Sequence, residues 1–253
     1  MNNPFIRKLE QLQLNQWPSL QTIYRDGWVL RFADGYSKRA NSVVPLFSYS
    51  TESPLHEAID DCESIYNSWG LRPTFKITPI AEPSGLDDEL EQRGYALIDR
   101  CSVQTLSLTG DLRKPQLQQV EILAQVTEAW LDHYCRLSHA ASHQKNTMYR
   151  MLQNIRTKAG FVLLYHADQV VACGFGVIEQ QYFGLWDIVT DPKFRQRGFG
   201  EQLVVHLLNW GRDNGATDSY LVVVANNTSA RKLYAKLGFK HVYEHWYRVK
   251  ENL

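Results

Sequence analysis

The sequence has few cysteines, no net charge and no long apolar run, and each of these absences excludes a class of protein. The four cysteines, in 253 residues, form no CxxC pair, so the usual spacing of a structural zinc site is missing. Four widely separated thiols favour a reducing compartment over a disulfide scaffold. Basic and acidic side chains are equal in number, 27 each, so the chain has no overall charge to attract nucleic acid or an anionic membrane.

Signals for export and for metal binding are also missing. No segment approaches the roughly 20 apolar residues that span a bilayer, and the first residues lack the apolar run of a signal peptide. The eight histidines show no HExxH or similar ligand spacing. We therefore expect a cytoplasmic protein with no metal, whose partner is neither a nucleic acid nor a membrane. The sequence leaves its oligomeric state open.

The apolar content, 44% with 12% aromatic residues, is enough for ordinary hydrophobic cores. In the first half, hydrophobic periodicity and turn residues predict strands at 28–32, 41–47, 74–77 and 102–108, a helix capped by Ser53 and ended by Gly70, and a short helix at 87–92. The polar stretch 109–115, which contains Gly110 and Pro115, is the best linker candidate. The expected domains are therefore residues 1–110 and 117–253.

In the second half the same signals predict strands at 120–123, 161–165, 170–178, 182–189, 220–224 and 242–249, and helices after Thr127 and over 146–155, 200–214 and 228–237. A faint repeat links the halves. Gly70 precedes a strand and Gly94 follows the next helix, and Gly215 and Gly238 hold the same places at nearly the same offset. The simplest interpretation is two copies of one α/β fold, the first degenerate; chance similarity is the alternative.

The strongest chemical feature is the segment between a predicted strand and a predicted helix, Arg195-Gln196-Arg197-Gly198-Phe199-Gly200. Two glycines two positions apart allow positive φ, and backbone N–H groups at a helix N-terminus form a nest for a phosphate or diphosphate. Arg195 and Arg197 add positive charge. A plain tight turn is the alternative, whereas a Walker A loop and a GxGxxG dinucleotide motif are both excluded.

A second segment, residues 227–239 with the sequence NTSARKLYAKLGF, follows this loop. Together the two segments resemble the signature of the GNAT superfamily of acyl-CoA N-acyltransferases. The first is similar to its Arg/Gln-x-x-Gly-x-Gly/Ala diphosphate loop and the second to its N-x-x-A-x-x-L-Y-x-x-x-G-F segment. The resemblance covers about residues 117–253. It implies the GNAT fold, an α/β (α+β) fold with a mixed central sheet flanked by helices, here in two tandem domains with the first degenerate.

The resemblance also implies acetyl-CoA as co-substrate, bound between the strands 182–189 and 220–224. The edge of the first strand would pair with the pantetheine arm, and a backbone N–H there would stabilise the oxyanion of the tetrahedral intermediate. The expected cofactor contacts are Ile188, Val189 and Thr190 on this edge, Arg195, Gln196, Arg197, Gly198, Phe199 and Gly200 in the loop, and Asn227 and Ala230 in the second segment.

The implied chemistry is direct attack of an amine on the thioester, with no metal and no acyl-enzyme. An alkylammonium has a pKa near 10, so it must first lose a proton. Asp187, acting through water, is the favoured base, and an ordinary polar strand residue is the alternative. Tyr234 matches the position of the family's usual general acid, which protonates the leaving thiolate; core packing is its alternative role.

The first half departs from the family pattern. Its corresponding loop, residues 50–54, has no glycine pair and carries Glu52, so we predict that this half does not bind coenzyme A. It resembles degenerate halves that help to form an acceptor site, with Arg39 and Asn41 recognising a carboxylate or amide; a solvated hairpin is the alternative. Trp130 and Tyr134 lie on the helix that walls the acceptor pocket in the family, although packing is their more ordinary use.

The function expected from these residues is N-acetylation of a primary amine of a small molecule or amino acid. The alternatives are acetylation of a protein N-terminus or lysine, and a non-catalytic sensor that binds coenzyme A. The neutral overall charge does not distinguish the two kinds of acceptor.

Overall fold

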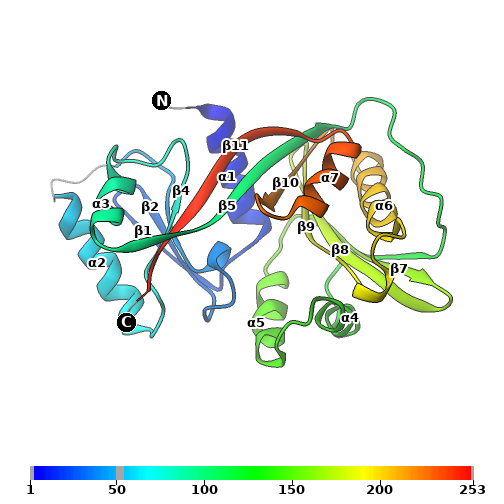
Figure 1. Ribbon diagram of the computed structural model, residues 1–253, viewed down its shortest axis with the longest axis horizontal. Coiled ribbons are helices and arrows are strands. Elements are labelled where there is room, and N and C mark those ends of the chain that lie inside the picture. Colours follow the sequence, from blue (N-terminus) through cyan, green and yellow to red (C-terminus); the bar gives the residue numbers. More distant parts are fainter. Residues whose placement is uncertain (1–2, 50–53, 252–253) are drawn as a thin grey trace. The chain divides into compact units, whose positions relative to one another are not determined.

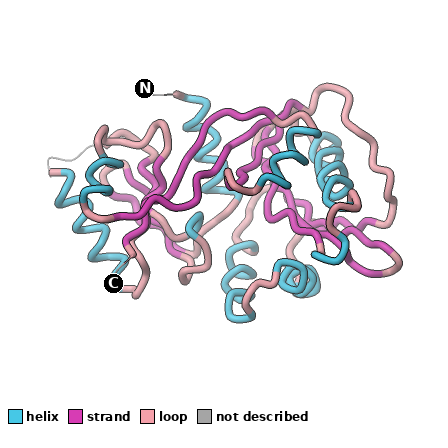
Figure 2. Tube along the Cα trace, viewed as in Figure 1, coloured by secondary structure: helices cyan, strands magenta, loops and turns pink. Residues whose placement is uncertain are grey.

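A computed structural model describes residues 3–49 and 54–251 (Figure 1). The chain folds into two compact units. Unit 1 comprises Met1–Val103, Val223–Thr228 and Val242–Leu253, and unit 2 comprises Gln104–Val222 and Ser229–His241. Both units combine strands with helices (Figure 2), so the expected α/β class with a mixed sheet and flanking helices is confirmed. The domain boundaries near residues 110 and 117 stay a prediction.

Unit 1 contains α1 (Pro4–Gln16), β1 (Gln21–Arg25), β2 (Trp28–Phe32), the 3-10 helix η1 (Lys38–Ala40), β3 (Val43–Pro45), α2 (Leu55–Ser68), β4 (Thr74–Ile77), α3 (Leu86–Gln92), and most of β5 (Tyr95–Ser107) and β11 (Lys240–Lys250). The strand order within this unit is β1-β2-β3-β4-β11-β5. β3 and β4 run parallel, whereas β1 with β2, β2 with β3, and β4 with β11 are antiparallel.

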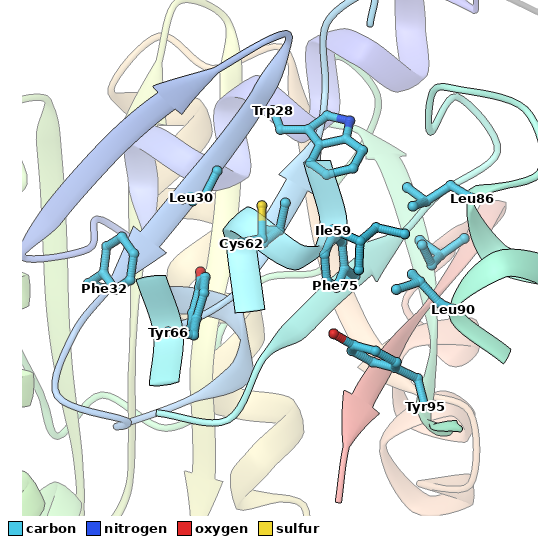
Figure 3. Packing of buried hydrophobic residues seen from close by; sticks show 12 residues of the cluster. Trp28, Leu30, Phe32, Ile59, Cys62, Tyr66, Phe75, Leu86, Leu90 and Tyr95 are labelled. Atoms are coloured by element: carbon cyan, nitrogen blue, oxygen red, sulfur yellow. The ribbon is translucent and has the colours of Figure 1, made fainter. Parts of the chain in front are cut away.

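One face of the unit 1 sheet carries the apolar core (Figure 3). The register places Leu30 opposite Val43, and Val43 opposite Phe75, so these side chains share a face. In α2, Ile59, Cys62 and Tyr66 recur at helical spacing and are buried against them. Ser53, the predicted cap of this helix, lies outside the described residues.

Unit 2 contains β6 (Val120–Leu123), α4 (Glu128–Ser138), α5 (Ser142–Leu152), β7 (Lys158–His166), β8 (Gln169–Glu179), β9 (Tyr182–Thr190), the 3-10 helix η2 (Pro192–Phe194), α6 (Phe199–Asp213), and most of β10 (Asp218–Val224) and α7 (Thr228–Lys236). The strand order is β10-β9-β8-β7-β6. The β9–β10 pair is parallel and is connected by α6, while β6 to β9 form an antiparallel meander. Every strand and helix predicted for the second half is present, with ends shifted by a few residues.

The polar segment before β6 lies along α6 in unit 2 and is held there by side chains of that helix. The Gln202 side-chain oxygen accepts hydrogen bonds from the backbone N–H groups of Gln116 and Leu117, at 2.7 and 3.3 Å. Asn209 donates to the carbonyl of Arg113 at 2.8 Å. The predicted linker thus has fixed partners, which its composition alone does not reveal.

Two further observations bear on the expectations from the sequence. Among the helices of residues 3–49 and 54–251, none is both long enough and apolar enough to cross a bilayer. The same residues contain no cluster of three or more histidine, cysteine or acidic side chains placed to hold a metal ion.

Candidate functional site

The end of β9 departs from regular antiparallel pairing with β8. The ladder is regular from Glu179↔Tyr182 to Phe175↔Trp186 and resumes at Cys173↔Val189, so Asp187 and Ile188 both lie opposite Gly174. This is a β-bulge, and Asp187 at its first position has a positive φ of +47°, as the first residue of a G1-type bulge does. A Cβ atom on Gly174 would lie 2.7 Å from the end of the Ile188 side chain and 3.3 Å from the Ile188 Cα atom, so a larger residue opposite the bulge would require Ile188 to move.

The other edge of β9 also changes at this point. Its parallel ladder with β10 runs from Tyr182↔Asp218 to Leu185↔Leu221 and stops there, whereas β9 continues to Thr190. Residues 186–190 therefore extend beyond the ladder, on the edge where the sequence predicted that the pantetheine arm binds. Edge N–H and C=O groups of this kind can pair with an extended ligand.

The loop after β9 leads directly into the N-terminus of α6. Gln196 and Gly198 have φ of +60° and +83°, and Gly198 is the N-cap residue of the helix. The first N–H groups of a helix have no partner within it, so they and the helix dipole favour an anion. This geometry is the one that the diphosphate prediction requires.

Gly200 has a different role from the predicted one. It does not have positive φ and lies within the first turn of α6. A Cβ atom there would lie 3.0 Å from the Thr190 hydroxyl oxygen and 3.9 Å from the Leu233 side chain. The absence of a side chain therefore lets the start of α6 approach the end of β9. Close packing, rather than backbone conformation, explains this glycine.

Arginine side chains surround the loop. Arg195 is exposed and donates to the carbonyl of Thr190 at 3.4 Å. The Arg197 guanidinium lies over the rings of Phe194 and Phe199, 5.3 and 5.7 Å from their centres. Stacking of this kind orients the guanidinium while its N–H groups remain on the exposed side of the loop.

A hollow of about 780 Å³ opens beside the loop. Five basic residues are among those that line it: Arg113, Lys114, His166, Arg197 and Lys236. Glu201, in the first turn of α6, also lines it and accepts hydrogen bonds from Lys236 and Arg113, at 2.5 and 2.8 Å. The hydrogen bond from Lys236 is the main cause that lowers the pKa of Glu201. The charged side chains of the lining are therefore mostly basic, and they suit a polyanion.

Tyr234 is buried on α7, with 8% of its surface exposed, and its ring meets Phe239 edge to face at 5.8 Å between centres. Its neighbour Leu233 approaches Gly200, so this turn of α7 packs near the start of α6. Ala230 is half-buried on the same helix. Asn227, in the turn before α7, is exposed, and its backbone N–H donates to the carbonyl of Val224 at 2.9 Å.

An ion pair that sequence reasoning missed fixes the end of β9. Arg136 on α4 donates to the Asp191 carboxylate at 3.2 Å and to the carbonyl of Val170 at 2.7 Å. Asp191 also caps η2 by accepting from the Lys193 N–H at 2.9 Å. These contacts tie α4, β8 and the turn after β9 together, so the bulge and the loop are held on both sides.

The expected acceptor residues of unit 2 differ in their surroundings. Trp130 is fully buried, and its indole N–H donates to the carbonyl of Val162 at 3.3 Å. Its ring stacks on half-buried Tyr134 at 5.5 Å between centres and meets Phe161 and Phe175 edge to face. These contacts are those of a core tryptophan, and substrate binding by Trp130 and Tyr134 stays a prediction.

In unit 1, Asn41 holds the loop before β3 in shape. Its side-chain oxygen accepts from the N–H groups of Ala33 and Gly35 at 2.7 and 3.0 Å, and its amide nitrogen donates to the carbonyl of Ser37 at 2.9 Å. Arg39, half-buried in the same loop, lies over the Trp17 ring, 5.4 Å from its centre. Substrate binding by these two residues stays a prediction.

Cysteine chemistry has no support at this site. Cys173, on β8 next to the bulge, is fully buried, and burial raises the pKa of its thiol, with the nearby Asp187 carboxylate adding to the effect. A protonated, inaccessible thiol is a poor nucleophile.

Comparison with known proteins places the chain in a family. The family model described as the C-terminal part of the probable histone acetyltransferase Rv0428c matches residues 4–249. The chain is 30% identical over 251 residues to the uncharacterized N-acetyltransferase YobR of Bacillus subtilis, covering 97% of this chain and 98% of YobR. It is 27% identical over 237 residues to the probable histone acetyltransferase Rv0428c of Mycobacterium tuberculosis, covering 93% of this chain and 70% of that protein.

A solved structure shows the same fold. The GCN5-related N-acetyltransferase from Kribbella flavida matches with a TM-score of 0.73 at 15% identity, covering 98% of this chain and 96% of that one. The superfamily and the fold implied by the sequence motifs are thus confirmed. The chain belongs to the family of the Rv0428c C-terminal region, within the GNAT superfamily of N-acetyltransferases, enzymes that use acetyl-CoA.

Proposed function

We propose that this chain binds acetyl-CoA along residues 186–190 of β9 and on the loop 195–200, and transfers the acetyl group to a primary amine of a small molecule. One observation carries the proposal: the parallel ladder ends at Leu185 just before the bulge at Asp187, and the strand leads within a few residues to an α6 N-terminus capped by a left-handed glycine. An extended arm and a diphosphate need these two features in this order.

The reaction follows from the chemistry of a thioester. The acceptor ammonium loses one proton, and the lone pair of the neutral amine attacks the carbonyl carbon of the acetyl group. The C–N bond forms as the carbonyl oxygen becomes an oxyanion, which backbone N–H groups of the β9 edge stabilise. The nitrogen, now positively charged, loses a second proton, the oxyanion collapses and the C–S bond breaks. The sulfur leaves as a thiolate and takes a proton, so that the products are an amide, the free thiol of coenzyme A and one released proton.

Two side chains are proposed to move these protons. Asp187 is half-buried at the bulge, next to the β9 edge, where its carboxylate can accept the amine proton through water. Tyr234 lies on the turn of α7 that packs against the start of α6, where its phenol can protonate the departing sulfur. Residues Ile188 to Thr190, Arg195 to Gly200, Asn227 and Ala230 are the proposed cofactor contacts, in a catalytic domain spanning residues 117–253.

Thiol release tests the proposal. The full chain is incubated with acetyl-CoA and a panel of amines, and free thiol is measured for the wild type and for Tyr234→Phe. We expect the variant to bind acetyl-CoA normally but to turn over about 10²- to 10⁴-fold more slowly, the range for loss of a general acid. Tyr165→Phe is the matched control. It removes a hydroxyl from β7 of the same unit, and this hydroxyl donates to the Glu121 carboxylate at 2.9 Å. Equal rates for all three proteins would refute the acid role of Tyr234.

A protein acceptor is the second candidate, because one relative is named a probable histone acetyltransferase. The same assay separates the two when lysine-containing and N-terminal peptides are added to the amine panel. Acetylation of peptides but not of small amines would replace the small-molecule proposal. Tight binding of acetyl-CoA without turnover of any acceptor would favour the non-catalytic sensor instead.

A further inference from the structure

The sheet of unit 1 has a polar face opposite its apolar core. Leu30, Phe75 and Ile77 point to the core of α2 and α3, so the strand residues between them point to the other side. Arg31 and Lys76 are two of these residues, and Lys76 pairs in register with Tyr247 of β11. Both cations are almost completely buried, with 4% of each residue exposed. Buried cations on a face that also carries the apolar Val29 and Val44 call for an account of their hydrogen bonds.

Part of this face is fully paired with α1. Lys76 donates to the Glu10 carboxylate at 2.6 Å and to the Gln13 side-chain oxygen at 3.0 Å. The Tyr243 hydroxyl donates to Glu10 at 2.5 Å and accepts from Gln13 at 3.0 Å. Arg31 donates to the backbone carbonyls of Leu14, Trp17 and Arg39. This half of the polar face is a closed structural network.

The other half of the face is not paired. Among the described residues, no hydrogen-bond partner exists for either ring nitrogen of His245 or for the Tyr247 hydroxyl, although these residues are only 1% and 3% exposed. Ser42 is fully buried, and its hydroxyl also has no hydrogen-bond partner among the described residues. Leaving such groups unsatisfied costs about 1–3 kcal/mol each. His245 and Tyr247 lie on alternate residues of one strand, and two such unsatisfied side chains next to each other point to a ligand.

Arg39 lies in the partly exposed loop that borders this face, where its backbone carbonyl accepts a hydrogen bond from Arg31. The rings of His245 and Tyr247 lie 5.6 Å apart and perpendicular. The Arg39 charge acts on both side chains. Burial, followed by the charges of Lys76 and Arg39, holds the pKa of His245 well below its ordinary value, and burial raises the pKa of Tyr247.

These surroundings select a negatively charged ligand. At neutral pH His245 is an uncharged imidazole with one N–H donor, and Tyr247 keeps its O–H donor. Of the buried charges on the paired part of the face, Arg31 and Lys76 are positive and only Glu10 is negative. Donors in a positive, water-poor environment bind an anion strongly.

We propose that His245, Tyr247 and Arg39 form a site within unit 1 that binds a small carboxylate such as an amino acid. This site does not depend on the proposed acetyl transfer. Arg39, chosen from the sequence as a substrate residue, is thereby joined by two residues of the C-terminal strand that no motif indicated.

Binding is tested on the full chain without acetyl-CoA, by calorimetry and by thermal unfolding. The probes are the common amino acids, the matching amino-acid amides, which lack the carboxylate charge, and inorganic phosphate. We expect at least one amino acid to bind saturably and its amide to bind far more weakly. Tyr247→Phe should weaken that binding about 10- to 100-fold, the effect of losing one hydrogen bond to a charged group.

Tyr243→Phe is the matched control, because it removes a hydroxyl from the same strand and the same face. Without ligand, Tyr247→Phe should keep or raise the unfolding temperature, since it removes an unpaired hydroxyl, whereas Tyr243→Phe should lower it by several degrees, since Glu10 and Gln13 lose a partner. A lower unfolding temperature for Tyr247→Phe would show that its hydroxyl is structural and would overturn the inference.

Four binding results would also overturn it: no saturable binding by any amino acid, equal binding of acids and amides, binding of phosphate alone, or undiminished binding by Tyr247→Phe. Acetyl transfer is measured separately by thiol release, so failure of the carboxylate site and failure of the proposed function give different results. Acetyl transfer without carboxylate binding would leave the acetyltransferase standing and remove the carboxylate site, and carboxylate binding without acetyl transfer would do the reverse.

Discussion

Replacing Gly198 by alanine separates the role of the loop in binding from its role in folding. Gly198 has φ of +83°, and a Cβ atom placed there has no neighbour within 4 Å. The substitution therefore introduces no clash, and its effect comes from the left-handed backbone conformation alone. That conformation costs a residue with a side chain about 1–2 kcal/mol, which lowers the unfolding temperature by about 2–4 °C for each kcal/mol in a chain of this size.

The chain offers a matched control at the other end of the same helix. Gly215 follows α6, has φ of +96°, and also has no neighbour within 4 Å of a Cβ atom. Gly215→Ala should therefore destabilise the fold to a similar extent as Gly198→Ala. The two variants differ in their position relative to the proposed binding site. Only Gly198 directly precedes the N–H groups that are proposed to bind the diphosphate.

Binding of acetyl-CoA should separate them. Without ligand, Gly198→Ala can relieve part of its strain by rotating the peptide, and binding must then restore the strained geometry. The affinity should fall by the relieved part of the 1–2 kcal/mol, up to about 5- to 30-fold in Kd, and the unfolding temperature reports the remainder, whereas Gly215→Ala should bind as tightly as the wild type. Calorimetry gives the three affinities and thermal unfolding the three stabilities. Unchanged affinity in Gly198→Ala, or an equal loss in both variants, would refute the proposed role of the loop.

Three further changes have defined outcomes. Gly174→Ala should destabilise the fold by about 1–3 kcal/mol of overpacking, because Ile188 at the bulge must shift. The shift should also weaken acetyl-CoA binding, and an unchanged affinity in calorimetry would contradict this. Glu201→Gln should destabilise the fold at pH 7, because the hydrogen bond from Lys236 lowers the pKa of Glu201 and so stabilises the folded state with the carboxylate charged. This contribution is lost as the pH falls below 4.5 and the carboxylate protonates, so the variant and the wild type should then unfold at similar temperatures. A difference in unfolding temperature that persists at acidic pH would contradict the prediction. Lys76→Met should destabilise unit 1 by about 3–5 kcal/mol because it leaves the buried charge of Glu10 unpaired, and addition of Glu10→Gln should restore part of the loss in denaturant titration.

Local signals made the second half readable from the sequence. Thr127 was predicted to cap α4, and its hydroxyl accepts from the Trp130 N–H at 3.1 Å. The loop before α6 was found because a glycine with positive φ, followed by a helix, leaves a short and recognisable pattern. In both cases the residues that determine the structure are neighbours in the chain.

The first half was harder because its structure depends on distant residues. The helix α1 was missed, since Glu10, Gln13 and Gln16 are buried on it and break the apolar periodicity that identifies helices. They face the polar side of the sheet, which includes Tyr243 from the far end of the chain. β1 was missed for another reason: among the described strands it pairs with β2 alone, and it is largely exposed, so no apolar alternation marks it.

Part of the candidate site was also beyond prediction from sequence. The bulge at Asp187 and Ile188 depends on how β9 pairs with β8, and no residue type in the strand predicts it. The ion pair between Arg136 and Asp191 joins residues that are distant in the chain. The motif resemblance identified the loop and Tyr234 from the sequence. The contacts that hold the end of β9 are visible only in the folded structure.

The two units share one structural theme and differ where the cofactor is proposed to bind. β3 and β4 form a parallel pair connected by α2, as β9 and β10 are connected by α6. In unit 1, however, the loop after β4 contacts the chain after β3: the Glu82 carboxylate accepts from the Tyr49 N–H at 3.3 Å, and the Glu82 carbonyl accepts from the Trp28 indole at 2.8 Å. A backbone N–H that follows β3 is thus already bonded, and its partner is a carboxylate, which would repel a diphosphate. We therefore expect one mole of acetyl-CoA bound per chain, and a stoichiometry of two by calorimetry would show that unit 1 has kept the site after all.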